Sequence, residues 1–214
     1  MPEQVVVVGA SGFGRESLDV LDALVRDGAP IEIRGVVDDA PHPDDRARLQ
    51  ARGVAYLGPI ESGLLTAVGS LSYVLGIGSP AVRRRLVERC DAAGLTAYTA
   101  VHPSAAIGTQ PAIGPGSVVC ARAVVSTNVT LGRHSHINPN ATIGHDSVLE
   151  DFVSMNPGAV VSGAVTIGTG TLVGASATIL QNLVIGSGVT VGAGAVVTRD
   201  VPDGVIVKGV PGRW

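Results

Sequence analysis

Hydrophobic residues recur at every sixth position through the second half of the chain. Seventeen consecutive positions of this series, from Val101 to Val197, hold Val, Ile, Leu or Met without an insertion. Small residues mostly stand two places before each position, and glycine often follows it. This period fits neither an amphipathic helix nor an alternating strand, but it is typical of a parallel β-helix. We therefore predict a solenoid in which three six-residue sides make one coil and the six-spaced side chains fill the core.

A second period of 18 residues supports this coil. The segments 137–144, 155–162 and 173–180 align with one another at that spacing. Asn138 and Asn156 are then expected on successive coils, about 4.8 Å apart, with their amides able to stack. The series breaks at Asp203, so the segment 195–214 is expected to cap the open end of the solenoid.

The first hundred residues follow a different pattern, in which apolar strands alternate with helices. Strands are predicted at 4–10, 31–39 and 72–78. Helices are predicted at 12–28, which ends at a glycine, and at 79–94, which begins with Ser-Pro. The polar segment 40–53 is expected to be a loop with a short helix. Alternating strands and helices predict an α/β domain with a short parallel sheet over residues 1–100, followed by the β-helix over 101–214.

A glycine-rich turn joins the first predicted strand to the first predicted helix. Glycines in the segment GASGFG, residues 9–14, let the backbone approach a phosphate at the positive end of a helix. Asp38 and Asp39 end the next strand, where a carboxylate commonly binds a ribose hydroxyl. A similar turn, LGIG, occupies residues 75–78. Two interpretations stay open: a nucleotide or nucleotide-sugar site, or tight turns that need glycine for steric reasons.

The glycine spacing in this turn is G-x-x-G-x-G, which differs from the dinucleotide fingerprint. An NAD-dependent oxidoreductase is therefore a less favoured interpretation, and a solenoid would have no role in such an enzyme.

His145 and Asp146 are the strongest chemical pair in the solenoid sequence. His145 follows the inward-pointing Ile143 by two residues, so its side chain should point outward at a strand edge or corner. A carboxylate beside an imidazole can fix its tautomer and make it more basic, which suits a general base. The alternative is a surface histidine that happens to lie beside a surface aspartate.

Charge and hydropathy exclude two classes of partner. The formal net charge of the 214-residue chain is -3, which gives no electrostatic footprint for a nucleic acid. No charged residue lies between Asp151 and Arg199, but Gly, Ser, Thr and Asn interrupt that stretch every few residues. It contains no run of about 20 apolar residues, so we expect no membrane span there.

The two cysteines, Cys90 and Cys120, fit neither a disulfide pattern nor a metal pattern. We expect free thiols in a reducing cytoplasm, and the acidic start of the chain does not resemble a signal peptide. His134 and His136 lie near His145 in sequence and suggest a zinc site, but their spacing suits one poorly. We therefore predict no bound metal.

Several segments together resemble the sialic acid O-acetyltransferase and nucleotide-sugar N-acetyltransferase family of bacterial hexapeptide-repeat acyltransferases. They are GASGFGRE at 9–16, VVDD at 36–39, GIGSPAVRRR at 76–85, NATIGHD at 140–146 and the ending at 192–213. The resemblance implies that the β-helix is left-handed and that residues 1–100 form a Rossmann-like domain that binds a nucleotide sugar. It also implies a homotrimer, with acetyl-CoA as co-substrate in a groove between the coils of adjacent subunits.

The resemblance assigns roles residue by residue. His145 matches the family's general base, and Asp146 matches the acid that raises its basicity. The positions expected to bind the acceptor are Gly9, Ser11, Gly12, Phe13, Asp38, Asp39, Gly78 and Asn138. Gly163 and Ala175 match positions whose backbone contacts the coenzyme.

Two positions depart from the family pattern. Phe13 stands where some members have histidine, which leaves the nucleotide and the sugar unassigned. Ser154 stands where the family often has a second histidine near the thioester carbonyl. His136 lies 18 residues before Ser154, one coil away. We expect His136 or the Ser154 hydroxyl to assist in binding the carbonyl of the coenzyme thioester.

The sequence thus predicts a cytoplasmic, acetyl-CoA-dependent acetyltransferase that acts on an amino group of a nucleotide-linked sugar. O-acetylation of a sugar or another small-molecule hydroxyl is the first alternative. A metal-dependent β-helix enzyme of the carbonic anhydrase type and a non-catalytic nucleotide-binding scaffold are the others.

Overall fold

The computed structural model describes residues 2–64 and 71–214 and divides the chain into two compact units, Met1–Ala100 and Val101–Trp214. Each unit is built around its own core of buried hydrophobic side chains. None of the helices in the described ranges combines the length and the hydropathy that crossing a bilayer requires.

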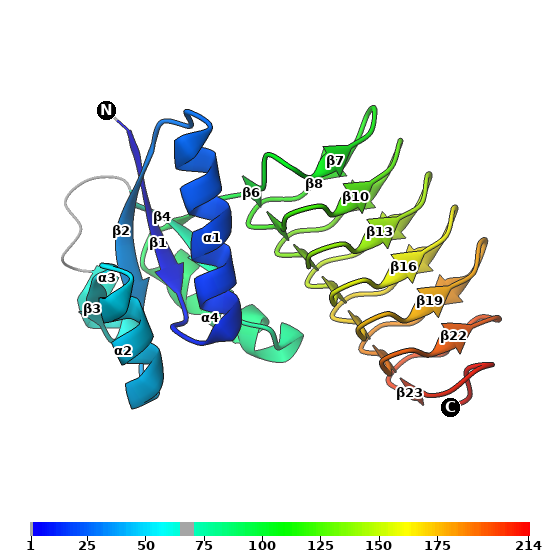
Figure 1. The fold of residues 1–214 in the computed structure, drawn as a ribbon. Coiled ribbons are helices and arrows are strands. Elements are labelled where there is room, and N and C mark those ends of the chain that lie inside the picture. The colour runs from blue at the N-terminus through cyan, green and yellow to red at the C-terminus, as the bar shows by residue number, and fades with distance from the viewer. Residues whose placement is uncertain (1, 65–70) are drawn as a thin grey trace. The chain divides into compact units, whose positions relative to one another are not determined.

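The first unit is a five-stranded parallel sheet with helices between its strands (Figure 1). The sheet order is β3-β2-β1-β4-β5. Its elements in chain order are β1 Glu3–Val8, α1 Gly12–Arg26, β2 Ile31–Val37, α2 Pro43–Ala51, β3 Tyr56–Gly58, α3 Ile60–Leu64, β4 Leu71–Leu75, α4 Pro80–Ala92 and β5 Thr96–Ala97. The last four residues of β1 are valines with no exposed surface, as expected for a central strand of a parallel sheet covered on both faces.

The predicted strands and helices of this unit are all present, with ends that differ by a few residues. The short helix expected within 40–53 is α2. The sequence pattern did not indicate β3, α3 or β5, because segments of two to five residues are too short to show a period.

The second unit is a parallel β-helix built from two-residue strands. They are β6 Ala100–Val101, β7 Ala106–Ile107, β8 Ala112–Ile113, β9 Val118–Val119, β10 Val124–Val125, β11 Thr130–Leu131, β12 His136–Ile137, β13 Thr142–Ile143, β14 Val148–Leu149, β15 Ser154–Met155, β16 Val160–Val161, β17 Thr166–Ile167, β18 Leu172–Val173, β19 Thr178–Ile179, β20 Val184–Ile185, β21 Thr190–Val191, β22 Val196–Val197 and β23 Ile206–Val207. From β6 to β22 every third strand joins the same sheet, and β23 pairs with β21, so the stacked coils of Figure 1 form three parallel sheets. Ile143 of β13 pairs with Val161 of β16, 18 residues later, so one coil has 18 residues as predicted.

The core of the β-helix is the predicted six-residue series. All members from Val119 to Val197 are buried. The earlier members belong to the first coil, which has only one neighbouring coil, and Ile107 there is 37 % exposed. The pattern therefore identified the buried side of every strand from β9 to β22.

The corners of the coil place the backbone in the left-handed region. Every sixth residue from Gln110 to Gly194 has a positive φ, three residues after each inward side chain. Glycine and asparagine fill most of these corners, because they adopt this conformation at the lowest cost, with aspartate close behind. Asn128 and Asp146 occupy two such corners, with φ of 58° and 60°, one coil apart.

Candidate active site

The histidine–aspartate pair lies at one corner of the β-helix, just after β13. His145 Nδ1 and Asp146 Oδ2 are 2.7 Å apart. The side chains are 64 % and 52 % exposed, so the pair points outward as predicted. An ionised carboxylate only accepts hydrogen bonds, so Nδ1 carries the proton that it donates to Asp146. This leaves the lone pair of Nε2 directed away from the aspartate and able to accept a proton.

Asn128 completes the arrangement from the coil below. Its Nδ2 donates a hydrogen bond of 2.9 Å to Asp146 Oδ1, the oxygen that His145 does not use. The hydrogen bonds from Asn128 and then from His145 lower the pKa of the Asp146 carboxyl below its usual range. The carboxylate is therefore ionised at any pH at which the imidazole can act as a base. Sequence analysis missed Asn128, although its position 18 residues before Asp146 could have indicated it.

Gly163 lies on the coil above His145 and leaves room for the imidazole ring. A Cβ atom at this glycine would stand 2.6 Å from both Cε1 and Nε2 of His145. Ala164 N donates to His145 O at 2.8 Å, which fixes the vertical register between the two coils. Gly163 therefore packs directly against the edge of the imidazole ring that carries the reactive nitrogen.

The other predicted residues of the β-helix lie on different strands and corners. His136 and Ser154 are paired neighbours in β12 and β15, and only 1 % and 2 % of their surfaces are exposed. Asn138 is also buried, and its Nδ2 donates to Met155 O on the next coil at 2.9 Å. The amide of Asn138 thus bonds to backbone, where a stack with Asn156 was expected. Ala175 precedes the corner at Ser176 and accepts a hydrogen bond from Gly194 N.

His134 and His136, the two histidines considered for a zinc site, are both buried. His134 is buried with its ring stacked on Phe152 at 5.5 Å between centroids. Within residues 2–64 and 71–214, no group of three or more His, Cys, Asp or Glu side chains could hold a metal ion.

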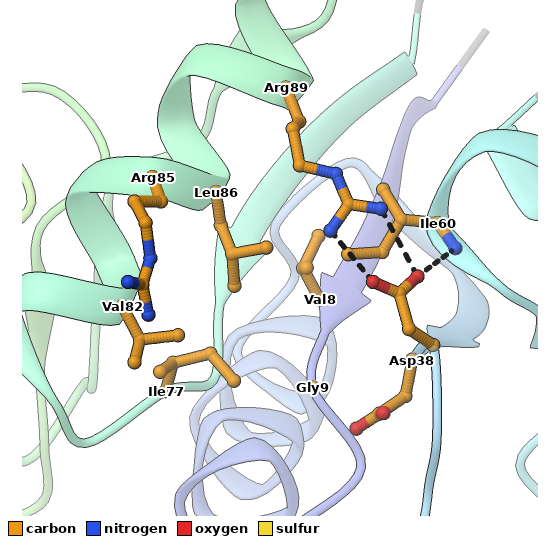
Figure 2. Close-up of a pocket in the computed structure, with 10 residues that line it drawn as sticks. Val8, Gly9, Asp38, Ile60, Ile77, Val82, Arg85, Leu86 and Arg89 are labelled. Carbon is orange, nitrogen blue, oxygen red and sulfur yellow. Dashed lines mark hydrogen bonds and ion pairs between the residues drawn. The ribbon is translucent and has the colours of Figure 1, made fainter.

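A pocket of about 380 Å³ opens at the carboxyl ends of the strands in the first unit. It adjoins the ends of the neighbouring strands β1 and β4. From β1 the chain continues to β2 on one side, and from β4 it continues to β5 on the other side. Open parallel sheets bind ligands at such a reversal of strand order. Figure 2 shows its apolar walls and the charged groups at its edge. The lining residues are Val8, Gly9, Asp38, Asp39, Ile60, Ile77, Val82, Arg85, Leu86 and Arg89.

The two predicted aspartates reach this pocket but already accept hydrogen bonds. Asp38 accepts from Ala10 N at 2.8 Å and from Ala40 N at 3.0 Å, so it ties the glycine-rich turn to the end of β2. Asp39 accepts from Ile60 N at 3.0 Å and forms an ion pair of 2.7 Å with Arg89. The hydrogen bond from Arg89 lowers the pKa of Asp39.

The glycine-rich turn is closely packed and contributes little to the lining of the pocket. A Cβ at Gly14 would overlap the carbonyl oxygen of Gly9, so glycine is required there for steric reasons. The predicted binding residues Ser11, Gly12, Phe13 and Gly78 do not line the pocket, and of this turn only Gly9 does. Gly78 instead accepts a hydrogen bond of 3.0 Å from the buried Arg83.

Helix α4 supplies four of the pocket residues that sequence analysis missed; the others are Val8, Ile60 and Ile77. Val82, Arg85, Leu86 and Arg89 are spaced by three and four residues and so share one face of the helix. The segment SPAVRRRLVERC predicted the helix, but not which face borders a pocket. Arg89 is balanced by Asp39 and Glu61. In the described part of the chain, Arg85 has no ion pair, and in Figure 2 its side chain extends along the wall formed by Val82 and Ile77.

Comparison with known proteins agrees with this architecture. The family model of the PglD N-terminal domain matches residues 4–90. The acetyltransferase domain of PglB from Neisseria gonorrhoeae FA1090, in complex with acetyl coenzyme A, is 33 % identical over 100 % of this chain and 99 % of its own, with a TM-score of 0.88. No curated protein sequence matches the chain.

Two further solved structures are similar over almost the whole chain. A variant of perosamine N-acetyltransferase from Caulobacter crescentus, in complex with CoA and GDP-perosamine, is 26 % identical and covers 98 % of this chain and 95 % of its own, with a TM-score of 0.85. WeeI from Acinetobacter baumannii AYE is 26 % identical and covers 99 % of both chains, with a TM-score of 0.86. The predicted fold class, an α/β domain followed by a left-handed parallel β-helix, is confirmed. This chain belongs to the nucleotide-sugar N-acetyltransferase family of hexapeptide-repeat acyltransferases.

Proposed function

We propose that the protein transfers an acetyl group from acetyl-CoA to an amino group of a nucleotide-linked sugar, with His145 as general base. The observation that carries the proposal is the exposed His145–Asp146 pair, in which Asp146 holds Nδ1 and leaves Nε2, packed against Gly163, to act as the base. Two relatives support the substrates, since one is in complex with acetyl coenzyme A and the other with CoA and GDP-perosamine.

In the proposed reaction His145 first accepts one proton and later gives it back. The nitrogen of the acceptor amine attacks the thioester carbonyl carbon while Nε2 of His145 takes a proton from that amine. The tetrahedral intermediate then collapses, the carbon–sulfur bond breaks, and the imidazolium returns the proton to the departing CoA thiolate. Asp146 stabilises the imidazolium that forms in between, because its carboxylate stays ionised.

Backbone groups near His145 supply the electrostatic part of the mechanism. Gly163 packs against the imidazole of His145, and its N–H has no hydrogen-bond acceptor within the described residues, so this N–H is proposed as a donor to the developing oxyanion. Ala175 is the second position proposed to contact the coenzyme. His136 or Ser154 is proposed to assist at the thioester carbonyl, which requires access to two side chains that are buried in the single chain.

The pocket of the first unit is proposed to hold the nucleotide. Its apolar residues Val8, Ile77 and Leu86 suit the face of a base, and the cation of Arg85 suits a phosphate. Asp39 and Arg89 lie at the opposite edge as an ion pair, where they can bind a hydroxyl or an edge of the base.

Assembly as a homotrimer is proposed with the active sites between subunits. Both side chains of the His145–Asp146 pair are more than half exposed in the single chain, and a neighbouring subunit would exclude water from them. On one outer face of the β-helix the outward positions of five successive strands hold only Val and Thr, which suits contact with another protein surface; they are Val124, Thr142, Val160, Thr178 and Val196. We also propose that the enzyme acts in the cytoplasm, where acetyl-CoA and nucleotide sugars are found together.

The test has two stages. A thermal-shift panel of UDP-, dTDP-, GDP- and CMP-linked amino sugars, each with and without CoA, identifies the acceptor, because specific binding raises the unfolding temperature. That acceptor is then incubated with acetyl-CoA, and the product is analysed by mass spectrometry before and after treatment with hydroxylamine. An acetylated product that resists hydroxylamine is the expected amide. A product cleaved by hydroxylamine would be an ester and would show O-acetylation, and the absence of any product would refute the proposal.

A further inference from the structure

We propose that Asn128 is a positioning residue for acetyl transfer, because its side-chain amide holds the Asp146 carboxylate in the orientation that serves His145. The three residues then act as one unit that spans two coils of the β-helix. This inference rests on the proposed function, since it assigns a role in that reaction to a residue outside the proposed catalytic pair.

The geometry of the two corners supports this assignment. Asn128 and Asp146 have nearly the same backbone conformation and are separated by one coil. Asp146 N donates to Thr127 O at 3.1 Å, which fixes one corner above the other. In this register Nδ2 of Asn128 reaches Oδ1 of Asp146, and Oδ2 remains for Nδ1 of His145. A carboxylate held at both oxygens loses the rotation that would otherwise break its contact with the imidazole.

A simpler explanation is that asparagine occurs at position 128 only because it tolerates the left-handed backbone. Asn140 and Asn182 occupy equivalent corners with φ of 59° and 60°. In the described part of the chain, neither of these two side chains forms a hydrogen bond with an acidic residue. The backbone requirement thus explains all three asparagines, but the bond to a carboxylate distinguishes Asn128.

The chemistry of the amide is matched to an ionised partner. The NH₂ group of asparagine only donates, so it favours the charged form of Asp146. Thr127 and Asn128 face Asp146 from the coil below, and Ala164 occupies the corner above. His145 is the only titratable group of the described residues that contributes to the pKa of Asp146. The network therefore has no second cation that could replace Asn128.

Two substitutions separate the positioning role from the backbone role. Asn128→Gly keeps the left-handed corner and removes the donor, and Asn128→Asp keeps the shape and sets one carboxylate against another. Loss of a hydrogen bond to a charged group predicts a fall in kcat of about 10- to 100-fold for Asn128→Gly, with the KM for acetyl-CoA unchanged. Asn128→Asp should fall further and lose activity at a higher pH on the acidic side, because paired carboxylates resist ionising together.

Asn140→Gly and Asn140→Asp are the matched controls, and both should keep the wild-type kcat and pH profile. Circular dichroism and thermal unfolding check that every variant is folded. The proposal is overturned if folded Asn128 variants keep a kcat within about twofold of wild type, or if the Asn140 pair loses as much activity.

A readout that does not depend on activity keeps the inference separate from the proposed function. Histidine labelled with ¹⁵N reports by NMR which ring nitrogen of His145 carries the proton. Wild type should hold the Nδ1–H form, and both Asn128 variants should populate the other form more. If this shift appears but no acetyl transfer is found, the proposed function fails and the positioning role stands. An unchanged tautomer ratio in both variants would refute the positioning role.

Discussion

Gly163→Ala should slow the enzyme strongly without unfolding it. The backbone of Gly163 is not in the left-handed region, so alanine fits the chain itself. The new Cβ would stand 2.6 Å from Cε1 and Nε2 of His145. Carbon atoms in contact prefer about 3.5–4.0 Å, so the imidazole must retreat by about 1 Å.

A displacement of that size is large for a proton-transfer step. Misplacing a reacting group by about 1 Å can cost about 100-fold in rate, and complete removal of a general base costs about 10²–10⁴-fold. We therefore expect kcat for Gly163→Ala to fall by about 100-fold. The unfolding temperature should change little, because the ring is exposed and can turn away. Release of free CoA, followed continuously with a thiol reagent, measures kcat, and differential scanning fluorimetry measures the unfolding temperature.

The double variant His145→Ala with Gly163→Ala is the control. If the glycine acts only by leaving room for the imidazole, the second substitution should add nothing once the ring is gone. A full additional loss in the double variant would show that Gly163 acts independently of His145. A single Gly163→Ala variant with wild-type kcat would refute the steric argument altogether.

Three further predictions concern stability and reactivity. Ile143→Ala removes most of a fully buried core side chain and should lower the free energy of unfolding, measured by urea titration, by about 2–5 kcal/mol. A loss below about 1 kcal/mol would contradict the assignment of Ile143 to the core. Burial raises the pKa of the Cys90 thiol to about 12, so iodoacetamide at pH 8 should label Cys90 only after unfolding, as peptide mass spectrometry would show; labelling of the folded protein would contradict this. Arg89 lowers the pKa of Asp39, so this pair should stabilise the fold above the unfolded-state pKa of about 3.9 and lose that effect as pH falls through the lower folded-state value. In thermal unfolding scans, Arg89→Gln should remove the part of the pH dependence of the unfolding temperature that this pair causes. An unchanged pH dependence would show that the pair does not contribute to stability.

The sequence predicted the solenoid well because each inward-pointing position of the repeat holds an apolar side chain that fills the core. Each inward position from Val119 to Val197 is buried, and each coil repeats the same three corners. The outward position of His145 followed from its offset to Ile143. The partnership with Asn128 did not, because it depends on which corners stack and on how a flexible amide turns within its corner.

The first unit was less predictable for a related reason. The strands and the glycine-rich turn have local signatures, but the pocket is formed where segments distant in sequence meet. Arg85 and Arg89 come from α4, and Ile60 comes from the start of α3, a helix too short to predict. Asp38 was expected to bind a ribose, yet its oxygens bond to backbone N–H groups, which a linear sequence cannot reveal. Membership of the family was predictable because its motifs extend over nearly the whole chain.

The kinetic comparison of wild type with His145→Ala tests the central claim most directly. Both proteins are assayed for CoA release with acetyl-CoA and the amino-sugar nucleotide that stabilises the fold, and acetyl-CoA affinity is measured separately by calorimetry. We predict that kcat falls by about 10²–10⁴-fold while the Kd for acetyl-CoA is unchanged. A His145→Ala enzyme that releases CoA at the wild-type rate would contradict the account.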